Sequence, residues 1–183
     1  MQEGYVVSQG MAVIAFALLV LSVWCKKRKQ VLLFQILGCS VYMLQYLLLQ
    51  FCTGYGLTGA VINLIGVIRT VIFIKKIPGE GKYKKILALF LNIYIIATII
   101  TWNGIGSIFS FFTGVSSTIG HYNSNTNKIR IFACVTCMFW MMYDIYIEAY
   151  VAMFGEICII ISNVISIMII GANNNELNKW KNG

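Results

Sequence analysis

The stretch GLTGAVINLIGVIRTVIFIKK, residues 56–76, is long enough to cross a bilayer as one helix, at about 1.5 Å per residue. It nevertheless carries Asn63 and Arg69 inside its apolar run. Polar groups at membrane depth are costly, so they usually face a protein interior or a solvated cavity. A second apolar stretch, residues 155–171, has Asn163 at nearly the matching place. The two stretches together predict a pair of related three-helix units with a polar site between them.

The composition indicates a membrane protein. Of the 183 residues 59% are hydrophobic and only 11% are charged, and the mean hydropathy is +0.80. Charged residues normally make up about a quarter of a globular chain, and a soluble domain of this size could not bury so much apolar surface. We therefore expect residues 1–183 to form a single integral membrane domain, with no sizeable soluble module.

The basic residues are arranged as in membrane loops. The net charge is +8, yet Lys and Arg occur in short clusters between apolar runs. Such clusters mark cytoplasmic loops, whereas nucleic-acid binding needs a basic face on a folded domain. All fourteen Lys and Arg residues except Arg69 fall in segments that we assign to the cytoplasmic side or within two residues of them. We expect the lipid bilayer as a partner and no nucleic acid.

The fold class that follows is an all-α membrane protein with seven transmembrane helices, the N-terminus outside and the C-terminus cytoplasmic. The expected spans are residues 5–24, 30–52, 56–76, 87–101, 105–120, 129–147 and 156–171. They divide as 3+1+3, with units at residues 5–76 and 104–172 and a linker with the fourth span at 77–103. Residues 173–183 form a cytoplasmic tail that we expect to be loosely ordered.

A sparse internal repeat supports the two units. An offset of 99 residues pairs Lys29 with Lys128, Gln45 with Asp144 and Gly56 with Gly155, and one added residue pairs Asn63 with Asn163. With three spans in each unit and one linker span, both units enter the membrane from the same side. This is a parallel repeat, related by an axis along the membrane normal, as in the SWEET sugar transporters, whose solute sites lie between the repeats.

The two asparagines are the first candidate site residues. Counted from Gly56 and Gly155, Asn63 lies about 10 Å and Asn163 about 12 Å into the membrane. Equal depth on equivalent helices favours a shared site, and amides offer donors and acceptors together, which suits a hydroxylated or amide-bearing neutral solute. The alternative is an interhelical hydrogen bond, worth less than about 2 kcal/mol.

Trp140 and Gln45 are further candidates for solute contact. Trp140 comes ten residues after Arg130, hence about 15 Å into the membrane. A tryptophan at this depth can stack on a flat or ring-shaped solute, or it can pack in the core. Gln45 is a candidate because the internal repeat pairs it with Asp144.

Charged residues complete the candidate set. Estimated depths put Arg69 and Asp144 about 14 Å apart along the membrane normal, which argues against an ion pair. We expect Arg69 to snorkel toward the cytoplasm, or else to bind an anionic group at the inner mouth. Glu148 and Glu156 bracket an expected external turn. Asp144 and Glu156 could bind a cation or proton at the outer side.

The expected fifth span carries small residues at every fourth position: Gly106, Ser110, Gly114 and Thr118. They share one helix face and would let helix backbones approach closely. A packing seam is the simpler interpretation, and a solute-lining wall is compatible with it.

Other reactive residues give no sign of catalysis. The six cysteines are scattered along apolar runs and behave best as small buried hydrophobes. His121, the single histidine, stands at an expected cytoplasmic helix end, and one histidine without nearby acids makes neither a metal site nor a catalytic relay. We expect no enzymatic activity, no metal and no cofactor.

Three short motifs resemble a known family. They are Gln9-Gly10 followed by VIAF at residues 13–16, the N-x5-R-T of residues 63–70, and the E-x6-N of residues 156–163. Over nearly the whole chain they resemble YgjV-like bacterial inner-membrane proteins. That family is similar in layout to the SWEET and PQ-loop transporters, which implies an inner-membrane location and solute contact by Asn63 and Asn163. The proline hinge of that group is absent, since the only proline, Pro78, lies in a loop.

The leading functional hypothesis is a membrane carrier for a small polar solute, working by alternating access. The alternative is a multi-spanning protein that transports nothing and serves in assembly, sensing or immunity. The third and weakest is a membrane-embedded enzyme, since no HExxH, GxSxG or paired intramembrane aspartate motif occurs. A homo-oligomer is compatible with the sequence, although seven spans can form a complete pathway in one chain.

Overall fold

The computed structural model describes residues 2–75, 82–123 and 125–182, and the regular structure in these ranges is α-helical, as predicted. The helices in chain order are α1 (Gln2–Trp24), α2 (Arg28–Thr53), α3 (Leu57–Ile74), α4 (Lys82–Ile100), α5 (Gly106–Tyr122), α6 (Thr126–Tyr146) and α7 (Tyr150–Asn182). The expected linker around Pro78 lies outside the described residues.

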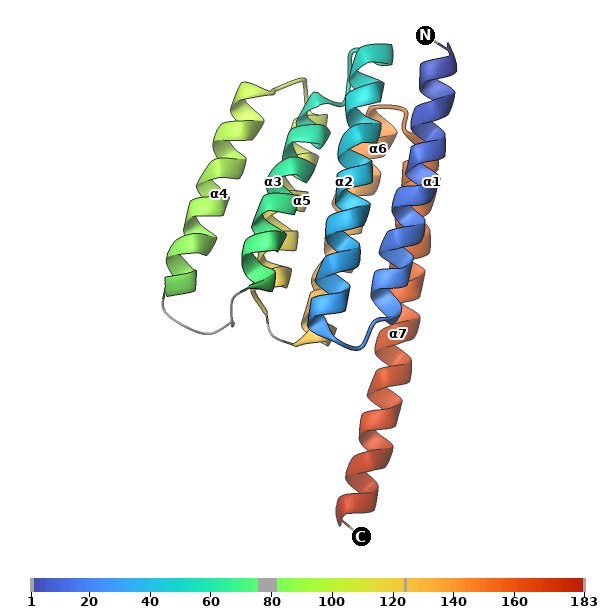
Figure 1. Cartoon of the computed structure of the whole chain (residues 1–183), viewed down its shortest axis with the longest axis vertical. Helices are drawn as coiled ribbons and strands as arrows, with labels where there is room; N and C mark the ends of the chain where they lie inside the picture. Colours follow the sequence, from blue (N-terminus) through green and yellow to red (C-terminus); the bar gives the residue numbers. More distant parts are fainter. Residues whose placement is uncertain (1, 76–81, 124, 183) are drawn as a thin grey trace.

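Six of the helices close into a ring, in which α1, α2, α3, α5, α6 and α7 each contact the next and α7 returns to α1. Helix α4 packs on the outside of this ring, against α3 and α5 (Figure 1). Within each run of three helices, the middle one, α2 or α6, contacts both of its neighbours. The ring therefore joins the two runs along two seams, α1 with α7 and α3 with α5.

Among the described residues, five helices are long and apolar enough to cross a membrane: α1, α2, α3, α6 and the part of α7 from Tyr150 to Ile169. The other two differ in composition or length. Helix α4 has 19 residues and begins with lysines, and α5 has 17 residues and is rich in Ser, Thr and Gly. Both run alongside the five within the same bundle (Figure 1).

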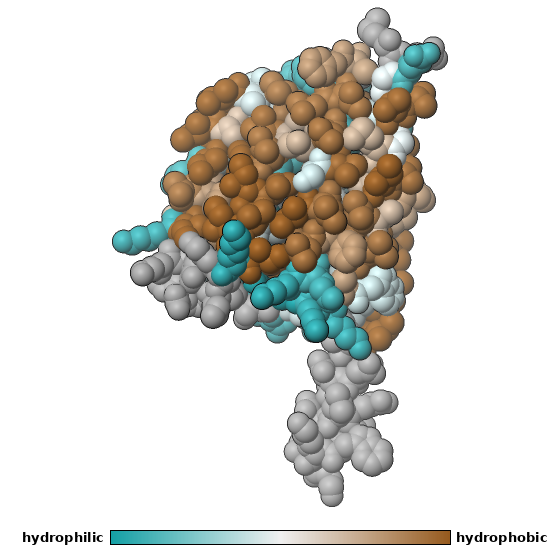
Figure 2. Space-filling model, in the orientation of Figure 1, coloured by the Kyte–Doolittle hydropathy of each residue, from teal (hydrophilic) through white to brown (hydrophobic). Residues whose placement is uncertain are grey.

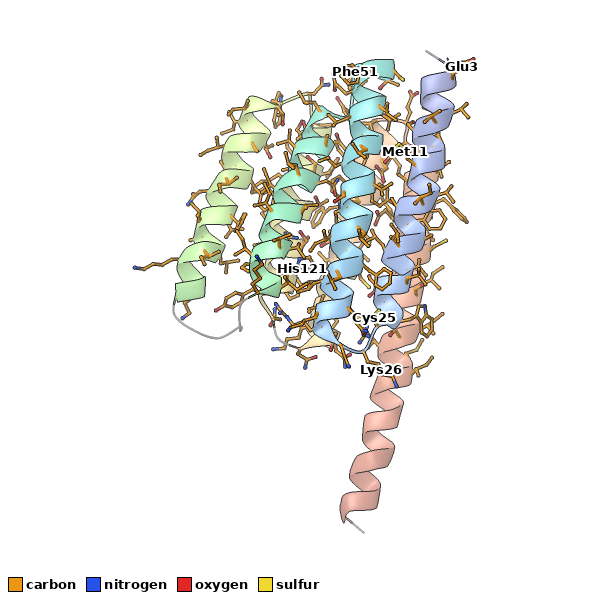
Figure 3. The ribbon with its side chains drawn as sticks, viewed as in Figure 1. Glu3, Met11, Cys25, Lys26, Phe51 and His121 are labelled. Carbon is orange, nitrogen blue, oxygen red and sulfur yellow. The ribbon has the colours of Figure 1, made fainter. Side chains whose placement is uncertain are left out.

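The surface fits a lipid environment. Large apolar side chains such as Phe51, Ile99 and Ile100 are 68–83% exposed, far more than a soluble monomer tolerates over a continuous surface. Figure 2 shows this apolar surface over most of the visible face, with hydrophilic residues gathered at one end. We call that end, which carries the α1–α2 connection, the basic end. Figure 3 places Cys25, Lys26 and His121 there, and Glu3 and Phe51 toward the opposite end.

The seventh helix differs from the expectation at both of its ends. It begins at Tyr150, six residues earlier than predicted, after a short turn in which Glu148 adopts a positive φ of 60°. Glu156 therefore lies inside the helix and not in an external turn. The helix also continues to Asn182, beyond the bundle (Figure 1), so the tail that we expected to be loosely ordered is helical.

An aromatic layer crosses the bundle in the half that is farther from the basic end. It consists of Tyr42 and Tyr46 on α2 and Trp140 and Tyr143 on α6. The Tyr46 ring centroid lies 5.4–5.9 Å from the other three. The hydroxyl of Tyr143 accepts a 2.9 Å hydrogen bond from the backbone N–H of Gly59 on α3. A side chain at Gly59 would strike the Tyr143 ring, so the glycine permits this approach.

The small-residue face of α5 is a packing seam and also part of a cavity wall. Gly106 packs on Tyr146 and Gly114 on Tyr94, both too closely for a Cβ atom. Ser110 and Thr118 are fully buried. Gly114 also lines the cavity described next, so both interpretations of this face hold.

Candidate functional site

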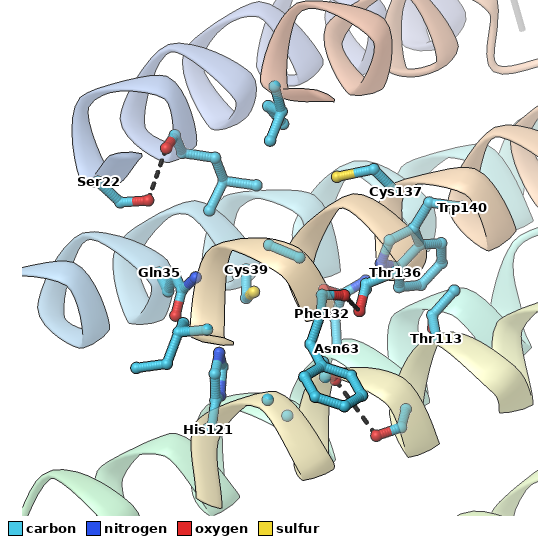
Figure 4. Close-up of a pocket in the computed structure, with 18 of the residues that line it drawn as sticks. Ser22, Gln35, Cys39, Asn63, Thr113, His121, Phe132, Thr136, Cys137 and Trp140 are labelled. Atoms are coloured by element: carbon cyan, nitrogen blue, oxygen red, sulfur yellow. Dashed lines mark hydrogen bonds between the residues drawn. The ribbon is translucent and has the colours of Figure 1, made fainter. Parts of the chain in front are cut away.

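A cavity of about 90 Å³ lies inside the ring, on the basic side of the aromatic layer. All seven helices contribute to its wall. It reaches from Trp140 and Glu156 near the aromatic layer to His121 and Arg130 near the basic end. Figure 4 shows Gln35, Asn63, His121 and Trp140 arranged around this space. A water needs about 10–15 Å³ on this measure, so the volume suffices for about six waters or a small solute.

Asn63 and Asn163 both line the cavity and are 5% and 1% exposed. Each amide nitrogen donates to a carbonyl one turn back on its own helix, Gly59 O at 3.0 Å and Ile159 O at 2.9 Å. These are not the interhelical bonds of the alternative interpretation. Within the described residues no donor reaches either amide oxygen, so both oxygens remain able to accept from a solute.

The equal depth expected for the two amides is wrong. Asn63 comes six residues after the start of α3, roughly 9 Å, whereas Asn163 comes thirteen after the start of α7, roughly 20 Å. Ser166, three residues beyond Asn163, bonds to Val23 O at the end of α1. Asn63 thus lies beside the aromatic layer, and Asn163 lies toward the basic end.

Arg69 does not snorkel, because it is 2% exposed and is held inside the bundle. Its Nη1 donates to the hydroxyls of Ser117 and Thr118, each at 2.7 Å, and to Tyr94 at 3.2 Å. These partners belong to α4 and α5, and all of them are neutral. Nη2 contacts Nδ1 of His121 at 2.9 Å. Arg69 lines the cavity and, across the described part of the chain, its Nε–H has no partner.

His121 lies in the last turn of α5, as expected, and is also part of this arginine site, which the sequence did not predict. It is 6% exposed, and its Nδ1 also lies 3.2 Å from the Thr70 hydroxyl. A guanidinium only donates, so Nδ1 must accept. The histidine side chain therefore supports the arginine that faces the cavity.

Glu156 is the cavity residue that sequence reasoning misplaced. It is 2% exposed, lines the cavity, and neighbours Tyr42 on α2 and Cys137 on α6. Its Oε2, the Tyr42 hydroxyl and Gln35 Oε1 are buried, and among the described residues none has a hydrogen-bond partner. The spacing of Glu156 and Asn163, seven residues or two helical turns, was a signal that both share one face of α7.

The other candidate residues lie either in the cavity wall or beside the aromatic layer. Trp140 lines the cavity and stacks on Tyr46, with ring planes 18° apart. Gln45 and Asp144 are fully buried but do not line the cavity. The Tyr46 hydroxyl donates to Asp144 Oδ1 at 2.7 Å, which places that carboxylate behind the aromatic layer. Asp144 is therefore buried, and the cation or proton site suggested for it stays a prediction.

Comparison with known proteins assigns the family. The model of the YgjV family, described as bacterial inner membrane protein, matches residues 6–173. The chain belongs to this family. The match agrees with the resemblance of the three motifs, and it covers all seven helices up to the part of α7 that leaves the bundle. No curated protein and no solved structure matches the chain.

Family membership gives the protein a location, the bacterial inner membrane, and the apolar helices make it a multi-pass protein. The motifs of this YgjV-family chain also meet in space. Asn63 and Arg69 from one motif, and Glu156 and Asn163 from another, line the same cavity. The similarity to SWEET and PQ-loop transporters stays a prediction.

Proposed function

We propose that this YgjV-family protein is a carrier that moves a small polar solute across the inner membrane by alternating access. The observation that carries the proposal is the cavity, in which partnerless buried polar atoms line a space inside an otherwise apolar bundle. Packed proteins rarely leave such atoms unpaired without a water or ligand to satisfy them. A binding space within one chain supports transport by a monomer.

The positive-inside rule places the basic end in the cytoplasm, with the N-terminus outside. The cavity extends toward this end, while the aromatic layer separates it from the other. In this orientation the cavity lies on the cytoplasmic side of the aromatic layer. The seal on the outer side consists of the layer and the helix ends above it.

Alternating access requires the two three-helix units, α1–α3 and α5–α7, to rock against each other. On the sealed side, several hydrogen bonds join the units, among them Tyr46 to Asp144, Gly59 to Tyr143 and Thr58 to Ser107. At the basic end, Arg28 on α2 donates to Asn123 O and His121 O, and Arg130 on α6 donates to Val23 O. We propose that the contacts of the sealed side break when the outer side opens, and that the arginine contacts break when the inner side opens.

The test is a thermal-stability screen of the purified protein against sugars, nucleosides, vitamins, organic acids and amino acids. We expect one class to raise the unfolding temperature of the wild type, with the effect lost in Asn63→Ala or Asn163→Ala. Asn92→Ala is the matched control. Asn92 makes the same bond to its own helix, to Ala88 O at 3.0 Å, but its side chain is exposed. Unchanged binding in both cavity variants would remove this site.

A further inference from the structure

Two opposite charges line the cavity without pairing with each other. The Arg69 guanidinium is held by neutral groups of α4 and α5, and the Glu156 carboxylate stands beside α2 and α6. The two charges therefore belong to opposite walls. Each has a buried atom with no partner in the described structure, Nε of Arg69 and Oε2 of Glu156. Buried charges are normally paired, because an unpaired one is expensive at membrane depth.

The arginine wall is suited to an anionic group. A guanidinium recognises carboxylate and phosphate oxygens through its fixed donors. Its present partners, Ser117 and Thr118, already donate their hydroxyl protons to Gly114 O, at 3.2 and 2.6 Å, so they keep a hydrogen bond without the arginine. An incoming anion can then take over donors of Arg69 without leaving these hydroxyls unsatisfied.

The glutamate wall is suited to a cationic donor. An ionised carboxylate only accepts, and an ammonium supplies three donors. The free Oε2 and the neighbouring Tyr42 hydroxyl, itself without a partner among the described residues, supply acceptors for such a group. Trp140, also in the wall, can add cation–π attraction.

We propose that the solute is a small zwitterion, with a carboxylate for Arg69 and an ammonium for Glu156 at the two ends of a short chain. This inference rests on the carrier function proposed above. Because the charges lie on opposite walls, an ω-amino acid, whose charges are several bonds apart, fits better than an α-amino acid. Asn63 and Asn163, whose amide oxygens are free to accept, line the space between the walls.

The experiment is a calorimetric titration of the purified full chain with glycine, β-alanine, 4-aminobutyrate and 6-aminohexanoate. Butyrate and butylamine are the matched probes that keep only one charge. We expect affinity to rise from glycine to 4-aminobutyrate, and to fall at least tenfold for butyrate and for butylamine. These comparisons use the wild type alone, so they do not depend on whether any variant folds.

Two variants then assign the charges to the walls. Glu156→Gln should lower the affinity for 4-aminobutyrate to that for butyrate, and Arg69→Gln should lower it to that for butylamine. Glu3→Gln and Lys75→Gln, at exposed positions, are the controls and should change neither. Equal binding of butyrate and 4-aminobutyrate would overturn the zwitterion.

The outcomes separate the two proposals. If a neutral solute such as glucose binds in the cavity and no amino acid does, the carrier stands and the zwitterion falls. If no probe of the broader screen binds and the cavity is inaccessible to water-soluble reagents, both proposals fall.

Discussion

Nη2 of Arg69 and Nδ1 of His121 lie 2.9 Å apart and join α3 to α5 inside the bundle. Because the guanidinium can only donate, the neutral imidazole must carry its proton on Nε2. The chain has one histidine, so a sample labelled with ¹⁵N-histidine reports this ring alone. At pH 7.5 we expect NMR to show an unprotonated Nδ1 and a protonated Nε2. The other tautomer, or a doubly protonated ring, would contradict the contact.

Arg69 is predicted to cost stability. A buried cation without a carboxylate is expensive, and its hydroxyl partners have other acceptors on α5. Arg69→Met should therefore raise the free energy of unfolding by about 1–2 kcal/mol while solute binding is lost. Thermal unfolding in detergent measures the first effect and titration the second.

The control for Arg69→Met is the same substitution at Arg28. Arg28 donates to the carbonyls of Phe73, His121 and Asn123, which end α3 and α5. Arg28→Met removes these charge-assisted bonds and should lower stability by about 1.5–3 kcal/mol. Two variants that destabilise equally would show that Arg69 is a structural residue.

Tyr46 is predicted to hold the seal. Its hydroxyl is the one donor to Asp144 that the described residues provide, since Oδ2 of that carboxylate has no partner. Tyr46→Phe should cost about 1–3 kcal/mol, because a buried acceptor is left unsatisfied. Tyr42→Phe, one turn away, removes a hydroxyl that already lacks a partner and should cost close to nothing. If urea unfolding showed a larger loss of stability for Tyr42→Phe than for Tyr46→Phe, this assignment would be refuted.

Gly59 is predicted to tolerate no side chain. A Cβ would lie 2.6 Å from Cε1 of Tyr143, whose ring is packed against Tyr46 and Trp140 and cannot retreat. Gly59→Ala should lower stability by about 1–3 kcal/mol through overpacking. Gly10→Ala meets nothing within 4 Å and should stabilise α1 by up to about 1 kcal/mol. If the unfolding temperatures of the two variants shifted in the same direction, this packing would be contradicted.

The sequence predicted the helices well because apolar length and basic clusters are local signals. It failed at the start of α7, where Glu148 and Glu156 suggested a turn. Only Glu148 lies in the turn. Glu156 is accommodated inside the helix because the cavity accepts a carboxylate, and a cavity formed by seven helices leaves no trace in local hydropathy.

For a related reason, the register of the predicted repeat does not agree with the positions of the residues along the helices. Counted from the helix starts, Asn63 corresponds to Glu156, six residues in, and Arg69 corresponds closely to Asn163. The predicted pairing differs from this one by seven residues, which is two helical turns and keeps the same face. The helical periodicity therefore identified the correct helix face, but it could not identify how far along the helix each residue lies. Likewise, all partners of Arg69 except Thr70 are 25–52 positions away in the chain, beyond any local pattern.

The central claim, a solvated cavity reached from the basic end, is tested most directly by labelling a single cysteine at position 163. Asn163→Cys is placed in a variant without the six native cysteines, and inside-out membrane vesicles are treated with a membrane-impermeant methanethiosulfonate. We predict rapid labelling, with protection by a bound solute, while Asn92→Cys on the exposed face of α4 stays unlabelled. No labelling of Cys at 163 from either side of the membrane would mean a dry interior and would contradict the carrier.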